Sequence, residues 1–280
     1  MNSIIEYFST IPSRDRTLLL AGGITIFWLL ETAAPLFRFG YQKWRHAGIN
    51  LFFTLTTILV NFTLAFLLLR VSQSTQDHQL GLLAWTGELP VIVSTLIGLL
   101  GLDLIGAYAI HWLQHRLRPL WQFHLIHHTD VYVDTTTANR HHPGESVFRF
   151  VATLLAVVVV GAPMWMIMLY QALSVVVSQF NHANIRLPER IDRIVSLVIV
   201  TPNMHHIHHH AVLPQTDTNY GNIFSIWDRL FGTFTTMRQE EINYGIDTYP
   251  EPGEHSRIGS LLMIPFRPYR SPTGGKVEIP

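Results

Sequence analysis

The most constraining feature of this sequence is a long run without charged side chains. Residues 47–69 contain no Asp, Glu, Lys or Arg over twenty-three consecutive positions. A helix of that length spans the ~30 Å hydrocarbon core of a bilayer. A buried core helix of a soluble protein is the alternative, but apolar stretches of that kind are usually shorter. We therefore expect a transmembrane helix and an integral membrane protein.

Two further segments support this interpretation. Residues 17–37 and 89–110 are apolar, and each carries a single charged side chain. The polar residues 70–90 contain Gly and Pro and are expected to form a loop. Together with the hairpin described next, the pattern predicts an all-α integral membrane protein with about four transmembrane helices.

A predicted hairpin covers residues 147–182, within a stretch that has no charged side chain from 150 to 185. Gly161-Ala162-Pro163 interrupts it, so we expect two helices, at about 147–160 and 163–182. The first is short for a full crossing. The sequence therefore leaves open whether the hairpin is re-entrant or crosses the bilayer twice.

Composition excludes several classes of site. The formal net charge is zero, which gives no indication of nucleic acid as a partner. The chain has no cysteine, and this excludes disulfides, thiolate zinc sites, iron–sulfur clusters and a cysteine nucleophile. Histidine is unusually abundant: thirteen of its 16 copies lie between residues 111 and 210.

Three histidine clusters have matching spacings, and each lies beside an apolar segment. His111 and His115 are one helical turn apart and should share a helix face. The H-x-x-H-H spacing then occurs twice. Its first copy is His124, His127 and His128, which are expected on a second shared helix face. Its second copy is His205, His208 and His209. Imidazoles that converge without an acidic partner are poor general bases but good metal ligands. Unrelated surface histidines would rarely repeat one spacing in this way.

A single histidine, His182, ends the second hairpin helix and should reach the same membrane edge as the clusters. A lone histidine is often structural, but this position favours a metal ligand. His206 and His210 do not fit the repeated spacing and are expected to lie outside the ligand set.

Four other residues are candidates for supporting the ligands. Asp103 lies eight positions before His111, near the same helix face, where it can orient an imidazole or face polar neighbours. Arg140, His142 and Glu145 belong to a predicted positioning loop in which Arg140 and Glu145 form an ion pair. The loop contains His-Pro-Gly, but no soluble haem domain surrounds it, so we expect no haem.

The number of imidazoles indicates two metal ions. Three suffice for one catalytic zinc, whereas eight or nine suit a pair of ions such as iron, zinc, copper or nickel. Trp112 stands where an H-E-x-x-H protease has its glutamate. Two metals without carboxylate bridges at a membrane face favour lipid oxidation over hydrolysis.

The distribution of Lys and Arg predicts the orientation. The loop at 38–46 has three such residues and the chain after residue 112 has many, whereas 70–90 has only Arg70. Cytoplasmic loops carry the excess of positive charge. We therefore expect a cytoplasmic helical cap that bears the histidine-rich di-metal site.

The motifs resemble those of the fatty acid hydroxylase / sterol desaturase superfamily, whose members are membrane di-iron oxygenases. The resemblance covers about residues 103–233 and includes the histidine clusters, Arg140-x-His142-Pro143-x-Glu145, Asn219-Tyr220-Gly221 and Trp227-Asp228-Arg229-Leu230-Phe231-Gly232-Thr233. Many members have Arg where this chain has Trp112, and some have a second histidine where it has Arg186.

The resemblance implies hydroxylation or desaturation of a fatty acyl, sterol or related lipid, with dioxygen as co-substrate. It implies two iron ions held by nine ligands, namely His111, His115, His124, His127, His128, His182, His205, His208 and His209. No flavin or nicotinamide motif is present, so electrons are expected from a separate reductase.

The expected organisation has three parts. Membrane helices occupy 1–110, the catalytic region with its hairpin occupies 111–235, and a cytoplasmic tail occupies 236–280. A membrane zinc hydrolase and a non-catalytic metal transporter are the alternative functions. A transporter would place polar ligands in mid-membrane, whereas these clusters adjoin the helix ends.

Overall fold

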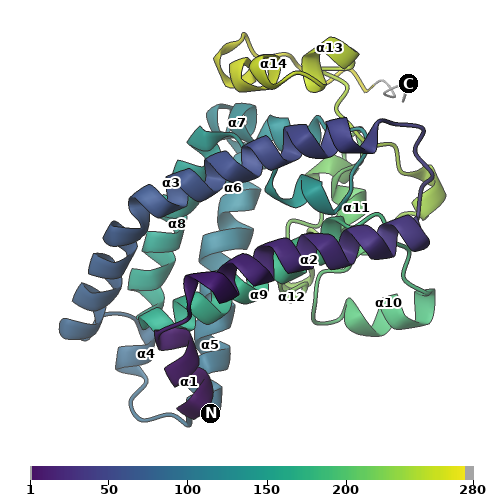
Figure 1. Cartoon of the computed structure of the whole chain (residues 1–280). Coiled ribbons are helices and arrows are strands. Elements are labelled where there is room, and N and C mark those ends of the chain that lie inside the picture. Colours follow the sequence, from purple (N-terminus) through teal and green to yellow (C-terminus); the bar gives the residue numbers. More distant parts are fainter. Residues whose placement is uncertain (1, 275–280) are drawn as a thin grey trace.

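The computed structural model describes residues 2–274 and is built from helices (Figure 1). Within these residues the only β pairing consists of three isolated bridges. Four helical stretches are long and apolar enough to cross a membrane: Ser13–Ala33, Lys43–Trp85, Val91–Arg116 and Pro143–Val160. Phe62 and Phe66 on the second stretch are 80% and 69% exposed, as expected of side chains that face lipid. The predicted all-α membrane architecture is confirmed.

The first long helices begin and end close to the predicted positions, with one correction. A short α1 (Asn2–Ser9) precedes α2 (Ser13–Ala33), and α3 (Lys43–Asp77) follows. The loop expected at 70–90 is therefore wrong over its first half, and α4 (Leu82–Trp85) is a further short helix within it. Residues 49–80 contain neither Gly nor Pro, and polar side chains alone do not end a helix.

The third span contains a local irregularity just before the first histidine cluster. It runs through α5 (Val91–Asp103), a π-helical turn at Leu104–Ala109 and α6 (Ile110–Arg116). The i→i+5 hydrogen bonds of a π-helix widen the turn. This rotates Asp103 relative to His111 and away from the face that regular α-helical spacing predicts.

The hairpin forms as predicted, with an earlier start. Its helices are α8 (Pro143–Val160) and α9 (Met164–His182). His142 caps α8 by accepting the Gly144 N–H at Nδ1 (2.9 Å), so the expected positioning loop is already helical at Pro143. Gly161 ends α8 with φ 77°, and a Cβ at this position would lie 2.6 Å from the Leu80 carbonyl oxygen. Glycine thus allows the end of α8 to approach closely the turn that follows α3.

The long helices pack around a shared cluster of apolar side chains. α3 packs along α8, while α9 contacts both α2 and α5. The core side chains include Leu102, Val157, Met166 and Ile167, all almost fully buried. This packing brings the ends of α6 and α9 towards the short helices of the cap.

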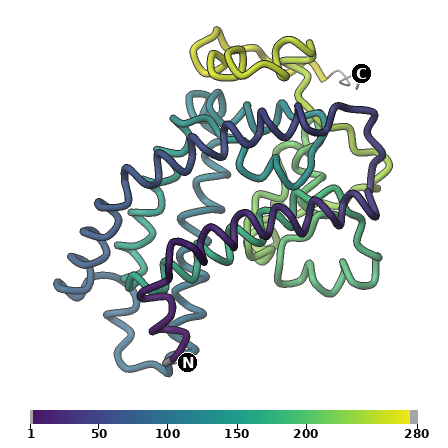
Figure 2. Tube along the Cα trace, viewed as in Figure 1, coloured from purple at the N-terminus to yellow at the C-terminus, as the bar shows by residue number. Residues whose placement is uncertain are grey.

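Short helices form the cap. They are α7 (Arg118–His128), η2 (Thr135–Asn139), α10 (Glu189–Val195), α11 (Pro202–His208), η3 (Gln215–Asp217), α12 (Ile226–Leu230) and η4 (Gln239–Glu241). The C-terminal α13 (Pro252–His255), α14 (Ile258–Met263) and η5 (Ile264–Phe266) form the yellow segment at one end of the molecule (Figure 2), and η5 contacts α7. Leu261 and Ile264 pack there against Leu125 and Ile126. The described C-terminal segment is therefore part of the packed cap.

Candidate metal centre

The nine histidines predicted as ligands come together in two buried groups. Within each group, one nitrogen of every ring lies within 4.8 Å of those of the others. The first histidine group consists of His111, His115, His124, His128 and His208. The second histidine group consists of His127, His182, His205 and His209.

The two groups adjoin because neighbouring residues on a helix point in different directions. His128 belongs to the first group and His127 to the second, and the same holds for His208 and His209. Consecutive residues on an α-helix differ by about 100° in direction. The prediction that all three histidines of α7 share one face is therefore wrong for His127. The His128 and His209 rings stack across the boundary with centroids 4.8 Å apart.

The start of α11 is fixed by its sequence. Thr201 accepts the Met204 N–H at its hydroxyl, and Pro202 occupies the first turn, where its missing N–H costs nothing. His205 and His208 then follow at helical spacing, and His209 comes directly after the helix. The Thr-Pro pair thus sets the register of the third cluster.

In the first group, four rings donate Nδ1–H to a fixed acceptor. These contacts are His111 to the Tyr220 carbonyl at 2.8 Å, His115 to Asp217 at 3.1 Å, His124 to Glu145 at 2.7 Å and His208 to the Thr218 carbonyl at 2.8 Å. Such contacts select the tautomer whose Nε2 carries a lone pair. The Nε2 atoms of these rings therefore present ligand lone pairs to the middle of the group.

The resulting contacts fit a cation. The Nε2 atoms of His111 and His124 lie 3.1 Å apart, and each presents a lone pair because Nδ1 holds the proton. The buried Nε2 atoms of His115 and His208 have no hydrogen-bond partner among the described residues. Buried acceptors that face one another cost free energy unless a positive charge lies between them. The donor set of the first group thus matches a bound metal ion.

The second group also has ring nitrogens that face one another, but fewer hydrogen bonds hold its rings in place. His182 donates Nδ1–H to the Ser178 carbonyl at 2.7 Å, and its Nε2 lies 3.2 Å from that of His127 and 3.0 Å from that of His205. Both nitrogens of His209 are buried and lack a hydrogen-bond partner within the described chain. This donor set also fits a metal ion.

Burial keeps the rings in the form that binds metal. Desolvation lowers the pKa of His127, His205 and His209 well below the ordinary value, and neighbouring histidines lower it further. Burial also lowers the pKa of His124 to about 4, even though Glu145 raises it. Neutral imidazole is the metal-binding form.

Sequence reasoning missed two side chains beside the clustered histidines. Asp217 accepts from His115 across 102 positions of sequence, and nothing in its local sequence marks it. His141 stacks on His127 with ring centroids 4.7 Å apart, and its Nδ1 lies 3.1 Å from Glu145. The sequence analysis gave His141 no role within the Arg140–Glu145 segment. The abundance of histidine between residues 111 and 210 was the one feature of the sequence that pointed to it.

Of the predicted supporting residues, Glu145 contacts a histidine of the first group. Its fully buried carboxylate accepts from His124 and, at 3.0 Å, from the Gln114 side chain. His142, in contrast, caps α8 and packs against Phe123 and Phe266.

Asp103 supports a loop instead of orienting an imidazole. It accepts hydrogen bonds from the Tyr170 hydroxyl, the Trp227 indole and the backbone N–H groups of Ile223 and Phe224. None of its hydrogen bonds within the described residues involves histidine. The wide π-helical turn explains this change of direction. Asp103 instead holds the loop that presents the Tyr220 carbonyl to His111.

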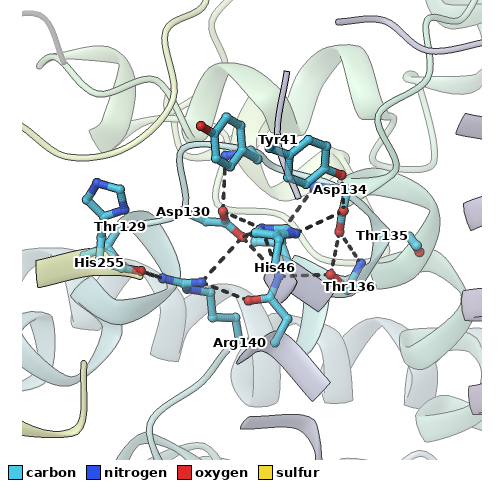
Figure 3. Close-up of polar contacts among 12 residues, drawn as sticks. Tyr41, His46, Thr129, Asp130, Asp134, Thr135, Thr136, Arg140 and His255 are labelled. Atoms are coloured by element: carbon cyan, nitrogen blue, oxygen red, sulfur yellow. Dashed lines mark hydrogen bonds and ion pairs between the residues drawn. The ribbon is translucent and has the colours of Figure 1, made fainter. Parts of the chain in front are cut away.

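Arg140 does not pair with Glu145 as predicted. It lies in a buried polar network with His46, Asp130 and Asp134 (Figure 3). Its guanidinium donates to the carbonyls of Ile126 and His255, and to Asn50 and Thr129. The last turn of α7 carries His127 and His128, so Arg140 ties this turn to α3 and to the C-terminal segment. The α8 helix begins between Arg140 and Glu145 and separates their side chains.

Comparison with known proteins identifies relatives for the region around this site. The ornithine lipid hydroxylase of Rhizobium tropici is 29% identical over 150 residues, which cover 54% of this chain and 44% of that protein. The alkylglycerol monooxygenase of Danio rerio is 29% identical over 161 residues, covering 55% and 33%. That of Homo sapiens is 26% identical over 155 residues, covering 54% and 32%. The matched segment spans less than half of each of these relatives.

No solved structure gives a significant match to the chain. The pattern of the fatty acid hydroxylase family matches residues 95–233, a segment that contains all nine clustered histidines. The sequence motifs, the helical membrane architecture and the relatives all indicate the same family. This multi-pass membrane protein therefore belongs to the fatty acid hydroxylase / sterol desaturase superfamily.

Proposed function

We propose that this protein is a di-iron, dioxygen-dependent lipid hydroxylase. The observation that carries the proposal is the pair of adjoining histidine groups, whose nine buried imidazoles leave ring nitrogens without other partners. The names of the relatives, a hydroxylase and monooxygenases, favour hydroxylation over desaturation. The proposed ligands are the nine histidines of the two groups.

The reaction balances as R–H + O2 + 2 e⁻ + 2 H⁺ → R–OH + H2O. Two iron ions can exchange electrons with dioxygen, whereas zinc has no redox chemistry. We propose that a separate reductase supplies the electrons, because the sequence has no dinucleotide-binding motif.

The protein contributes position, charge and exclusion of water. The Tyr220 and Thr218 carbonyls, with Asp217 and Glu145, fix ring orientation in the first histidine group. Two carboxylates next to neutral ligands offset positive charge. We propose that an alkyl chain lies along the apolar helices α8 and α9, whose packed side chains would keep bulk water from the site.

The test is turnover with isotopically labelled dioxygen. Protein purified from iron-replete cells is incubated with lipid extract, a ferredoxin-type electron donor system and ¹⁸O2. We expect one ¹⁸O atom in a hydroxylated lipid and none with His205→Ala. Anaerobic activity with zinc and without reductant would instead establish a hydrolase and overturn the proposal.

We also propose that the site faces the cytoplasm, and that residues 111–235 form the catalytic region between the N-terminal membrane helices and a cytoplasmic tail. The Lys and Arg distribution supports the orientation. Because the chain has no cysteine, Glu88→Cys and Glu240→Cys each introduce a unique label. A membrane-impermeant maleimide should label position 88 in intact cells, and position 240 only after permeabilisation. The reverse pattern would invert the topology.

A further inference from the structure

A separate cavity of about 200 Å³ lies beside the first histidine group and is not used by the proposed chemistry. His115 forms part of its wall, and the Trp121 ring, which also lines it, packs against His115 with centroids 4.7 Å apart. The cavity therefore adjoins the candidate metal centre directly. Its other walls come from the turn between α6 and α7, the loop at 211–217 and the C-terminal segment.

Two arginines give one side of this cavity its positive charge. Arg116 and Arg118 both line it, and neither has an ion-pair partner within residues 2–274. Their described ring contacts are to Trp112 and Tyr269 respectively, and both arginines are exposed. Guanidinium groups are well suited to bind a carboxylate or a phosphate.

An aspartate gives another part of the wall negative charge. Asp247 is 91% buried, and its Oδ2 accepts from the backbone N–H groups of Thr273 and Gly274. Its Oδ1 is buried and has no hydrogen-bond partner among the described residues. A buried carboxylate oxygen without a donor is costly, which indicates a ligand with an N–H or ammonium group. The other acid of the wall, Asp217, is already engaged by His115.

We propose that this cavity binds the zwitterionic headgroup of the lipid substrate, with its anionic group on Arg116 and Arg118 and its ammonium on Asp247. The inference rests on the proposed function, since it specifies the substrate class of that site. The cavity is smaller than the ~300–1,000 Å³ of pockets for whole drug-sized ligands, as suits one polar part of a larger molecule. Because its wall carries both positive and negative side chains, the cavity fits a zwitterionic headgroup better than it fits the surface of an acidic electron-donor protein.

The experiment compares lipids with the same alkyl chains and different headgroups. Thermal unfolding of the purified protein in a neutral detergent is followed as ornithine lipid, phosphatidic acid or alkylglycerol is added, because a ligand that binds the folded state raises the midpoint. We expect ornithine lipid to bind at least tenfold more tightly than either of the others. Free ornithine and inorganic phosphate test whether the ligand is a soluble molecule, and we expect neither to bind at the concentrations at which the lipid does.

The variants assign this preference to the cavity. Arg116→Gln with Arg118→Gln, and separately Asp247→Asn, should each weaken ornithine lipid binding at least tenfold while alkylglycerol binding and iron content stay constant. Arg190→Gln, an exposed arginine on α10, is the matched control and should change nothing. Equal binding of all three lipids, equal binding of free ornithine, or an effect of the arginine pair on electron transfer alone would each overturn the inference.

The same titration in His205→Ala separates this inference from the proposed function. That variant should lose turnover and keep the headgroup preference. If the preference is found but no hydroxylation occurs with the unmodified protein, the headgroup site stands and the proposed reaction fails. If hydroxylation occurs without any headgroup preference, the reaction stands and the headgroup site fails.

Discussion

The two histidine groups hold their rings in different ways. Within residues 2–274, four of the five rings in the first group donate Nδ1–H to a carbonyl or carboxylate, whereas in the second group only His182 does so. Asp217 and Glu145 contact the first group. Within the described residues, no carboxylate forms a hydrogen bond or ion pair with a ring of the second group. The two groups thus consist of similar rings, but fewer hydrogen bonds hold the rings of the second group.

This difference predicts unequal metal affinity. A carboxylate that accepts from a ligand imidazole fixes its orientation and raises its basicity, and it offsets the charge of the ion. The first group has two such carboxylates and one more ring than the second. We therefore expect it to bind its metal more tightly and to release it last when a chelator is added.

Removing one proposed ligand from each group should give the largest effect. His209→Ala leaves three rings in the second group, whereas His128→Ala leaves four in the first. We expect His209→Ala to lose about one iron per chain and His128→Ala to lose less, with metal measured by mass spectrometry after gel filtration. Both should lose more activity than the ~10–100-fold typical of substitutions outside the ligand set.

The control for this pair is His78→Ala. His78 is exposed at the end of α3, far along the chain from both groups. It should keep full iron content and activity. Equal metal loss from His128→Ala and His209→Ala would show that the carboxylates and the fifth ring do not make the first group stronger.

The next largest effect should come from removing the negative charge of Glu145 while keeping its hydrogen bond with His124. Glu145→Gln keeps an oxygen that can accept from His124 but removes the negative charge. We expect metal affinity of the first group to fall ~10–100-fold, with the second group unchanged. Asp217→Asn should have a smaller effect, because the Asp217 side chain is 29% exposed and water already screens its charge. Chelator titration of each variant measures both affinities, and a loss confined to the second group would contradict this assignment.

The sequence predicted which histidines come together because histidine spacing is a local property. His111 and His115, or His205 and His208, lie on one short helix, so a regular spacing brings their rings together. It did not predict which ring belongs to which group, since His127 and His128 are adjacent and only their direction separates them. The apolar runs predicted the membrane helices for the same reason, because length and hydropathy are local.

The supporting contacts were largely beyond sequence reasoning because they join distant segments. Asp217 and His115 are 102 positions apart and come into contact only in the folded chain. Arg140 and the backbone carbonyl that it contacts, that of His255, are 115 positions apart. The direction of the Asp103 side chain depends on the π-helical turn at Leu104–Ala109, and no residue type in that segment predicts such a turn. The ion pair expected between Arg140 and Glu145 failed because α8 starts between them.

Asp103→Asn should give a moderate effect confined to the first group. The Asp103 carboxylate accepts four hydrogen bonds, and an amide nitrogen in its place would face donors. We expect a destabilisation of about 1–3 kcal/mol and a lower thermal midpoint. The loop that carries the Tyr220 carbonyl should loosen, so His111 loses its orientation and the first group loses metal affinity. Unchanged affinity together with a lower midpoint would limit Asp103 to stability.

Substitution of His206 should give the smallest effect, although the proposed ligands His205 and His208 lie on the same helix, α11. Its Nε2 is 3.4 Å from the His182 carbonyl oxygen, and its ring meets Tyr244 edge to face with centroids 5.6 Å apart. It therefore faces away from both groups. His206→Gln keeps a donor near that carbonyl, whereas His206→Phe removes it and keeps an aromatic ring. We expect both variants to retain two irons per chain, and only His206→Phe to lose about 0.5–1.5 kcal/mol of stability. Loss of one iron in either variant would identify His206 as a ligand. The repeated spacing would then fail to distinguish His206 from its neighbours His205 and His208.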